Sequence, residues 1–231
     1  MADTRQVGAL ILVAGAVCAF WALGDKDSSD EHEVSGKISE VKLDSPNADI
    51  TIKVGGETLR LTSDCGWQCH VDFEVTVPRG TKVTGENGSG DLSIAGVSGV
   101  DASSRSGRVE LEDISGDVKL ELTSGEAAID RLTGKLDFEA TSGDLSAEHL
   151  KGGPVNVKTT SGDLHVSLDE AADVTAEGTS SEIHIEAPAG DYQINTKAQN
   201  GDVDNNLTDN PAATHKINAT TVSGDIDLST N

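Results

Sequence analysis

The stretch TTSGDLHV, residues 159–166, carries the clearest signal in the chain. In it, Ser-Gly-Asp comes directly before an apolar–polar–apolar run, and this arrangement recurs along the chain. Copies of the pattern begin 17 to 23 residues apart, at Ser89, Ser106, Ser124, Ser142, Ser161, Ser180, Asn200 and Ser223. A unit that recurs at intervals of about 20 residues is typical of a solenoid, in which each coil buries its apolar side against its neighbours.

Two or three short strands, joined by glycine corners, are predicted in each repeat. Leu164 and Val166 flank the polar His165 after the triplet, and Val155 and Val157 alternate in the same way before it. Period-two alternation gives a strand one buried face, and no long 3.6-residue pattern is present. The sequence therefore predicts an all-β fold, a single-stranded parallel β-helix or solenoid with about 18–20 residues per coil, whose coils stack about 4.8 Å apart.

The Ser-Gly-Asp triplet has two interpretations. Glycine supplies the backbone angles of a tight corner, and Ser and Asp can hydrogen-bond the backbone groups there. If the coils stack in register, the acidic residue of each triplet also joins a column of carboxylates, and such a column could bind Ca²⁺. No cofactor is required by the first interpretation, whereas the second predicts a cation site at Asp144, Asp163, Glu182, Asp202 and Asp225.

Two histidines form a second candidate site. His165 and His184 lie one repeat apart in the same outward column, which Asp204 and Asp227 continue. Stacked imidazoles of this kind could bind a transition metal or a proton. The alternative is that they belong to a solvated strand face.

The N-terminal part of the chain differs in composition from the repeats. The 18 residues from Val7 to Gly24 are uncharged, Arg5 precedes them, and an acidic stretch follows. We expect a transmembrane or signal helix at 1–24, a linker at 25–33 and the solenoid at 34–231. An uncleaved single-pass anchor would place the solenoid outside the cell membrane, and a cleaved signal peptide would release it as a secreted protein.

Composition limits the partners. The net charge is −23, from 40 acidic and 17 basic residues, so we expect no nucleic acid partner. Aromatic residues make up 3% of the chain, which is low for a carbohydrate platform. No known nucleophile, phosphate-loop or zinc-protease motif occurs, so we expect no enzyme activity.

Cys65 and Cys69 enclose three residues and are followed by His70. In an extracellular protein a local disulfide is the simplest interpretation of this pair. A weak metal site that includes His70, and two free thiols, stay open as alternatives.

The triplets and the stretch DCGWQCHVDFEVTVPRGTKV, residues 64–83, together resemble a known family. It is the bacterial "putative adhesin" β-strand-repeat family, a toastrack-like domain of unknown function, and the likeness covers about Val34 to Asn231. The resemblance implies a β-helix-like solenoid outside the cell membrane, and it implies no agreed activity or catalytic residues.

These observations lead to one expected function and two alternatives. We expect a membrane-tethered, non-enzymatic module that acts as an adhesin or envelope sensor and contacts a protein or cell-surface partner. A divalent-cation-binding solenoid is the alternative, and a polysaccharide-acting β-helix enzyme is a further one.

Overall fold

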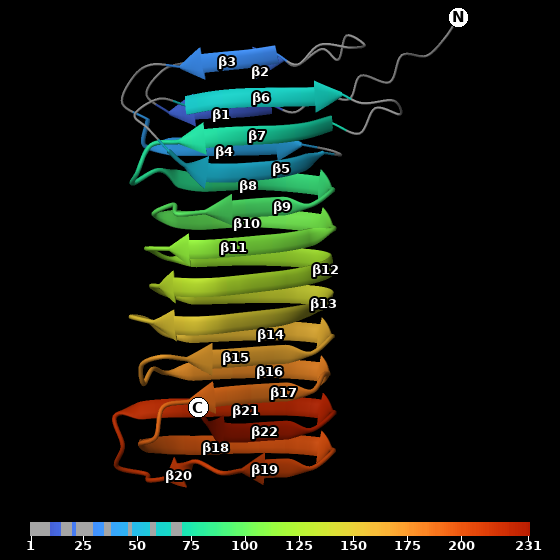
Figure 1. The fold of residues 1–231 in the computed structure, drawn as a ribbon. Coiled ribbons are helices and arrows are strands. Elements are labelled where there is room, and N and C mark those ends of the chain that lie inside the picture. The colour runs from blue at the N-terminus through green and yellow to red at the C-terminus, as the bar shows by residue number, and fades with distance from the viewer. Residues whose placement is uncertain are drawn as a thin grey trace, which may run out of the picture.

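The computed structural model describes residues 10–14, 20–21, 30–34, 38–45, 48–55, 59–65 and 71–231. Within these ranges the regular elements are all strands, and most of them form a parallel β-solenoid of about eight turns (Figure 1). The predicted fold class is confirmed for this part of the chain.

Each coil contributes one strand to each of two rows, joined at the Ser-Gly-Asp corner. The first row runs, in stacking order, β4 (Glu40–Ser45), β8 (Lys82–Ser89), β10 (Gly99–Ser106), the first halves of β12 (Val118–Thr133) and β13 (Leu136–Lys151), β14 (Val155–Ser161), β16 (Val174–Ser180), β21 (His215–Ser223) and β18 (Asp191–Asn200). The second row runs β5 (Asp49–Val54), β9 (Leu92–Ala95), β11 (Arg108–Ile114), the second halves of β12 and β13, β15 (Leu164–Leu168), β17 (Ile183–Ala187), β22 (Ile226–Thr230) and β19 (Val203–Asn205).

The end of the solenoid that carries the first coil is extended mainly by antiparallel strands. In the first row, β1 (Leu10–Ala14) pairs with β4, and β2 (Phe20–Trp21) pairs with β1. In the second row, β7 (Val71–Val77) lies parallel to β5, followed by antiparallel β6 (Leu59–Cys65) and β3 (Asp30–Val34).

The expected N-terminal helix is not supported by the structure. Of the segment Val7–Gly24, the described residues are strands β1 and β2, and the others lie outside the described residues. A short apolar run that contains Ile and Val can form a strand as well as a helix, and here it pairs with the edge of β4. In the described part of the chain, no helix has the length and apolar character needed to cross a membrane.

Stacking order departs from chain order at the C-terminus. The last coil, β21 and β22, lies between the coil β16–β17 and the coil β18–β19, although both of those precede it in sequence. In Figure 1 the C-terminus accordingly lies above β18 and β19 rather than at the end of the stack. The backbone N–H of Lys216 donates to Asp173 Oδ1, 43 residues away, at 3.0 Å. The sequence-based expectation that neighbouring repeats are neighbouring coils is therefore wrong at this point.

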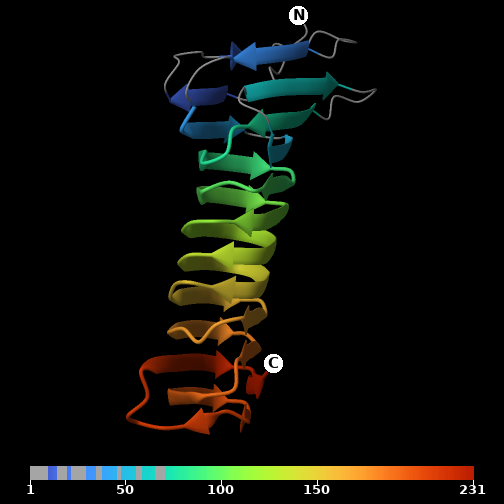
Figure 2. The ribbon, with the colours of Figure 1, turned by 60° about the vertical axis from the view of Figure 1, so that its left-hand side comes forward.

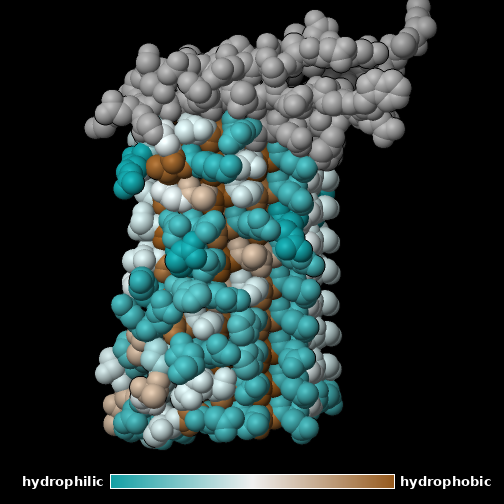
Figure 3. Space-filling view, in the orientation of Figure 1, coloured by the Kyte–Doolittle hydropathy of each residue, from teal (hydrophilic) through white to brown (hydrophobic). Residues whose placement is uncertain are grey.

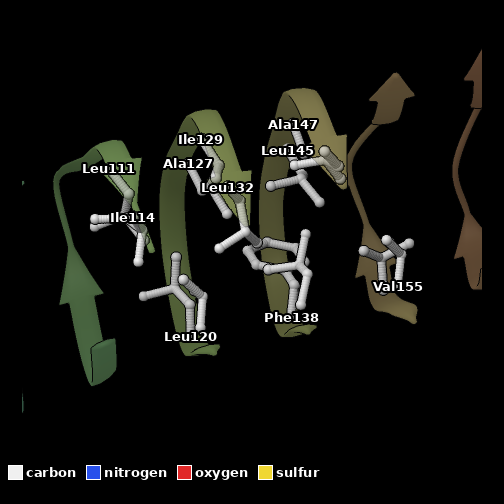
Figure 4. Close-up of a cluster of buried hydrophobic side chains, with 14 of the residues drawn as sticks. Leu111, Ile114, Leu120, Ala127, Ile129, Leu132, Phe138, Leu145, Ala147 and Val155 are labelled. Atoms are coloured by element: carbon white, nitrogen blue, oxygen red, sulfur yellow. The ribbon is translucent and has the colours of Figure 1, made fainter. Parts of the chain in front are cut away.

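The core is a continuous apolar column between the two rows. Val118, Leu120 and Leu122 of β12 pair with Leu136, Phe138 and Ala140 of β13, and all six side chains are buried. Figure 4 shows Leu120 and Phe138 inside the coil, on the side opposite the second-row residues Ile129 and Leu145. On the face shown in Figure 3, the described residues at the surface are largely polar, because alternate residues of each strand point outward.

Gly162 shows why the corner needs glycine. Its φ is +125°, a region that L residues rarely adopt, and a Cβ added there would lie 2.2 Å from the carbonyl oxygen of Gly143 in the preceding coil. The corner glycine therefore permits both the turn and the close stacking of the coils.

Candidate functional site

The aspartates of the triplets hold neighbouring coils together. Asp144 Oδ1 accepts a hydrogen bond from the backbone N–H of Asp163 at 2.9 Å, and Asp163 Oδ1 accepts one from the N–H of Glu182 at 3.1 Å. Asp225 Oδ1 accepts from the N–H of Asp202 at 2.8 Å. Each of these carboxylates satisfies a corner N–H of the next coil, and this contact accounts for the repeated Asp without a ligand.

The predicted carboxylate column exists, but its order differs. Because the C-terminal coil is inserted, the column runs Asp144, Asp163, Glu182, Asp225, Asp202, and the last two residues are exchanged relative to the sequence. This exchange also changes the histidine column, in which Asp227 rather than Asp204 lies next to His184.

His165 and His184 lie on neighbouring coils with their rings stacked. The ring centroids are 5.0 Å apart and the planes differ by 7°. His184 Nδ1 lies 3.2 Å from Asp227 Oδ2, and His184 Nε2 lies 3.2 Å from Glu186 Oε1. The hydrogen bond with His184 keeps the pKa of Glu186 below its ordinary value. Both nitrogens of this imidazole thus face carboxylates.

The two predicted sites line one groove. We call it the carboxylate–histidine groove: it is lined by Asp144, Asp163, Glu182, His165 and His184, among others, and has a volume of about 370 Å³. Arg108 and Glu126 also line it and are ion-paired to each other at 2.5 Å. The sequence named both columns as candidates, but it did not show that they face a common groove.

The predicted metal ligands are not arranged around one point. Among the described residues, no group of three or more His, Cys, Asp or Glu side chains is placed to hold a metal ion. Binding of Ca²⁺ along the column therefore stays a prediction. The predicted Cys65–Cys69 disulfide lies outside the described residues, because Cys69 and the side chain of Cys65 are not described.

A second cluster was missed by the sequence analysis. Asp113, Arg131 and His149 have φ values of 55°, 58° and 56° and lie on successive coils, near the end of each second-row strand. Arg131 forms ion pairs with Glu112, Asp113 and Asp130, and its hydrogen bond keeps the pKa of Asp113 below the ordinary value. All three residues stand seven positions after a repeat start, so the repeat alignment held a signal for this column.

The fold and the groove define the chain as a repeat scaffold with an outward array of charged side chains. The chain belongs to the Toastrack DUF4097 family, whose model matches residues 28–229, and the resemblance noted in the sequence is thereby confirmed. The crystal structure of a "putative cell adhesion protein" from Clostridium sporogenes ATCC 15579 is similar to the chain with a TM-score of 0.29 and 8% identity, over 88% of this chain and 100% of that one. No match to a curated protein was found.

Proposed function

We propose that the chain is a non-enzymatic interaction module that presents its solenoid outside the cell membrane, as an adhesin or envelope sensor. The observation that carries this proposal is the carboxylate–histidine groove, which extends over several coils and brings carboxylates and imidazoles to one exposed surface. A partner with basic groups along an extended surface would complement it in charge.

The hydrogen bonds of the groove support binding rather than catalysis. Asp144 and Asp163 are engaged with backbone N–H groups, and His184 contacts Glu186 and Asp227 on its two nitrogens. A histidine that serves as a general base for a nucleophile has one nitrogen directed at a hydroxyl or thiol. His184 is instead held between two carboxylates.

The location of the module is part of the proposal. The support for this location is compositional: the segment Val7–Gly24 is uncharged and Arg5 precedes it, whereas its described residues form strands β1 and β2 rather than a helix. Release after cleavage is the alternative. Protease added to intact cells whose outer layers have been made permeable should remove the solenoid. Complete protection would contradict this orientation.

A capture experiment tests the function. Beads that carry the full chain should retain intact cells or isolated envelopes, and Glu182→Lys should reduce retention because it reverses a charge in the groove. Glu177→Lys is the matched control, since Glu177 belongs to the same coil but lies in the other row, away from the groove. Equal loss with both variants, or no capture by the natural chain, would contradict the proposal, as would cleavage of a glycan substrate by the chain.

A further inference from the structure

The coil β18–β19, at the far end of the stack from β3 and β6, is incompletely covered. Val203 is 43% exposed, whereas Ile226 and Ile183, which occupy the same inward column in the next coils, are 1% and 0% exposed. Ile194 is only partly buried, whereas its partner Ile217 is 0% exposed. Solenoids require a cap on such an end, because an open end exposes the apolar column.

The outer edge of β18 is paired over only part of its length. Its inner edge pairs with β21 from Tyr192 to Asn200. On the outer edge, β20 (Thr208–Asp209) pairs only with Asp191 and Tyr192, and Asp209 Oδ1 accepts a hydrogen bond from the N–H of Ile194 at 3.1 Å. Alternate residues of a parallel strand direct their backbone groups to the same side, so Thr196 and Ala198 also point outward. Among the described residues, no strand pairs with them there.

One half of this end is covered by the chain itself. Leu207 is 7% exposed and precedes β20, so the segment after β19 closes the end of the core beside Tyr192. Figure 2 shows this segment passing beneath β18 before the chain returns to β21. A half-covered end is self-complementary under a twofold axis, because the open half of each copy can receive the strand of the other.

We infer that two copies of the chain join end to end by antiparallel pairing of β18 with β18 of a second copy. If Thr196 lies on the twofold axis, Ile194 faces Ala198 of the second copy, and Thr196 faces its own equivalent. The N–H of Ile194 then exchanges Asp209 Oδ1 for the carbonyl oxygen of Ala198 in the second copy. In the outward column, Gln193 then faces Gln199 and Asn195 faces Lys197. This register matches apolar with apolar residues and places no like charges opposite each other within β18.

This seam is separate from the carboxylate–histidine groove and does not depend on it. The partner at this seam is a second copy of the chain. The two solenoids point in opposite directions from the seam, since β3 and β6 lie at the other end of each (Figure 1). Such a contact suits adhesion between two surfaces that each carry the chain.

Analytical ultracentrifugation of the full chain in mild detergent tests the inference. The natural chain should show a concentration-dependent dimer, and Ala198→Pro should abolish it, because proline removes an outward N–H and obstructs the partner strand. Asn195→Lys should weaken the dimer about tenfold, because two symmetric contacts gain like charges, and Asn195→Asp should tighten it. Asn218→Lys is the matched control: Asn218 lies beside Asn195 in the same outward column, but one coil inside the end.

The inference is overturned if the natural chain stays monomeric at every concentration, or if Asn195→Lys and Asn218→Lys change the dimer equally. Thermal melting of each variant shows whether it folds, and if Ala198→Pro does not, the two lysine variants decide the question. A monomer that still captures envelopes on beads would reject the seam and leave the proposed function intact.

Discussion

The coils from β10 to β17 and the coils from β18 to β22 are built from the same repeat but stack differently. In the first region each repeat lies on the one before it, and paired residues are 18 or 19 positions apart. In the second region the chain leaves one level open, and the C-terminal repeat returns to fill it. The repeat therefore defines a coil, but it does not define which coils are neighbours.

The difference has an energetic reason. The inward residues of the C-terminal coil, Ile217, Ala219, Ile226 and Leu228, are all 0–1% exposed, so this coil takes an interior position. The coil at the end has Thr196 and Asn205 in inward columns, where apolar residues stand elsewhere. Burial of apolar surface favours the more apolar coil inside and leaves the more polar one at the end.

The largest effect is expected when engineered disulfides are used to test which coils are neighbours. In a background with the three native cysteines replaced by serine, Thr175→Cys with Asn218→Cys should form a disulfide on oxidation, because the two strands are adjacent. Thr175→Cys with Asn195→Cys should not, because Asn195 lies one coil further, at about twice the 4.8 Å strand spacing. Mass spectrometry of peptides decides between them, and the opposite result would restore sequential stacking.

Truncation of an inward side chain should cost more stability in an interior coil than in the end coil. Leu120→Ala and Leu164→Ala should each lower the free energy of unfolding by about 2–5 kcal/mol, because both side chains are buried and would leave cavities. Val203→Ala should lower it by less than about 1 kcal/mol, since Val203 is 43% exposed. Denaturant unfolding measures these values, with the outward Ser93→Ala as control. Equal effects from Leu120 and Ser93 would mean that the inward and outward faces are assigned wrongly.

Corner glycines should be intolerant of a side chain where coils are close. Gly162→Ala should cost about 1–3 kcal/mol of unfolding free energy from its positive φ alone, in addition to the contact with the carbonyl of Gly143. Gly190→Ala is the control, because its nearest atoms would be 3.9 Å away and its φ is not in the left-handed region. A similar loss from both variants in thermal melts would show that the corner geometry is not the cause.

The contact between His184 and Glu186 should appear in the pH dependence of stability. A carboxyl whose pKa is lowered in the folded state stabilises the fold above its unfolded pKa of about 4.3, and this contribution is lost as the pH falls through the folded value. Glu186→Gln should therefore reduce the melting temperature slightly at neutral pH and have no effect in strong acid. An effect that grows as the pH falls would contradict this assignment.

The smallest effect is expected from calcium. Asp144, Asp163 and Asp225 already accept backbone hydrogen bonds, so we expect Ca²⁺ and Na⁺ at matched ionic strength to shift the melting temperature equally, through screening. A larger shift with Ca²⁺, lost in Asp163→Asn, would favour a cation site along the column.

Much of the site could be predicted from the repeat, because a fixed offset from each triplet returns the same place on every coil. His165 and His184 were placed together in this way, and the structure stacks their rings. The turn residues Asp113 and Arg131 obey the same rule but were missed, because their left-handed backbone has no distinctive residue type. The groove lies on the second row and its corners, so its extent depended on how the second-row strands of several coils stack.

The sequence alone determined the coil: its two strands, its glycine corner and its buried columns follow from local alternation and from backbone angles that only a few residues permit. Only the tertiary structure decided the order of the last coils, the partners of His184 and the half-covered end. The strands of every repeat have similar edges, so local sequence patterns allow a coil to stack on several different coils. The choice among them depends on the total apolar surface that the assembled stack removes from water.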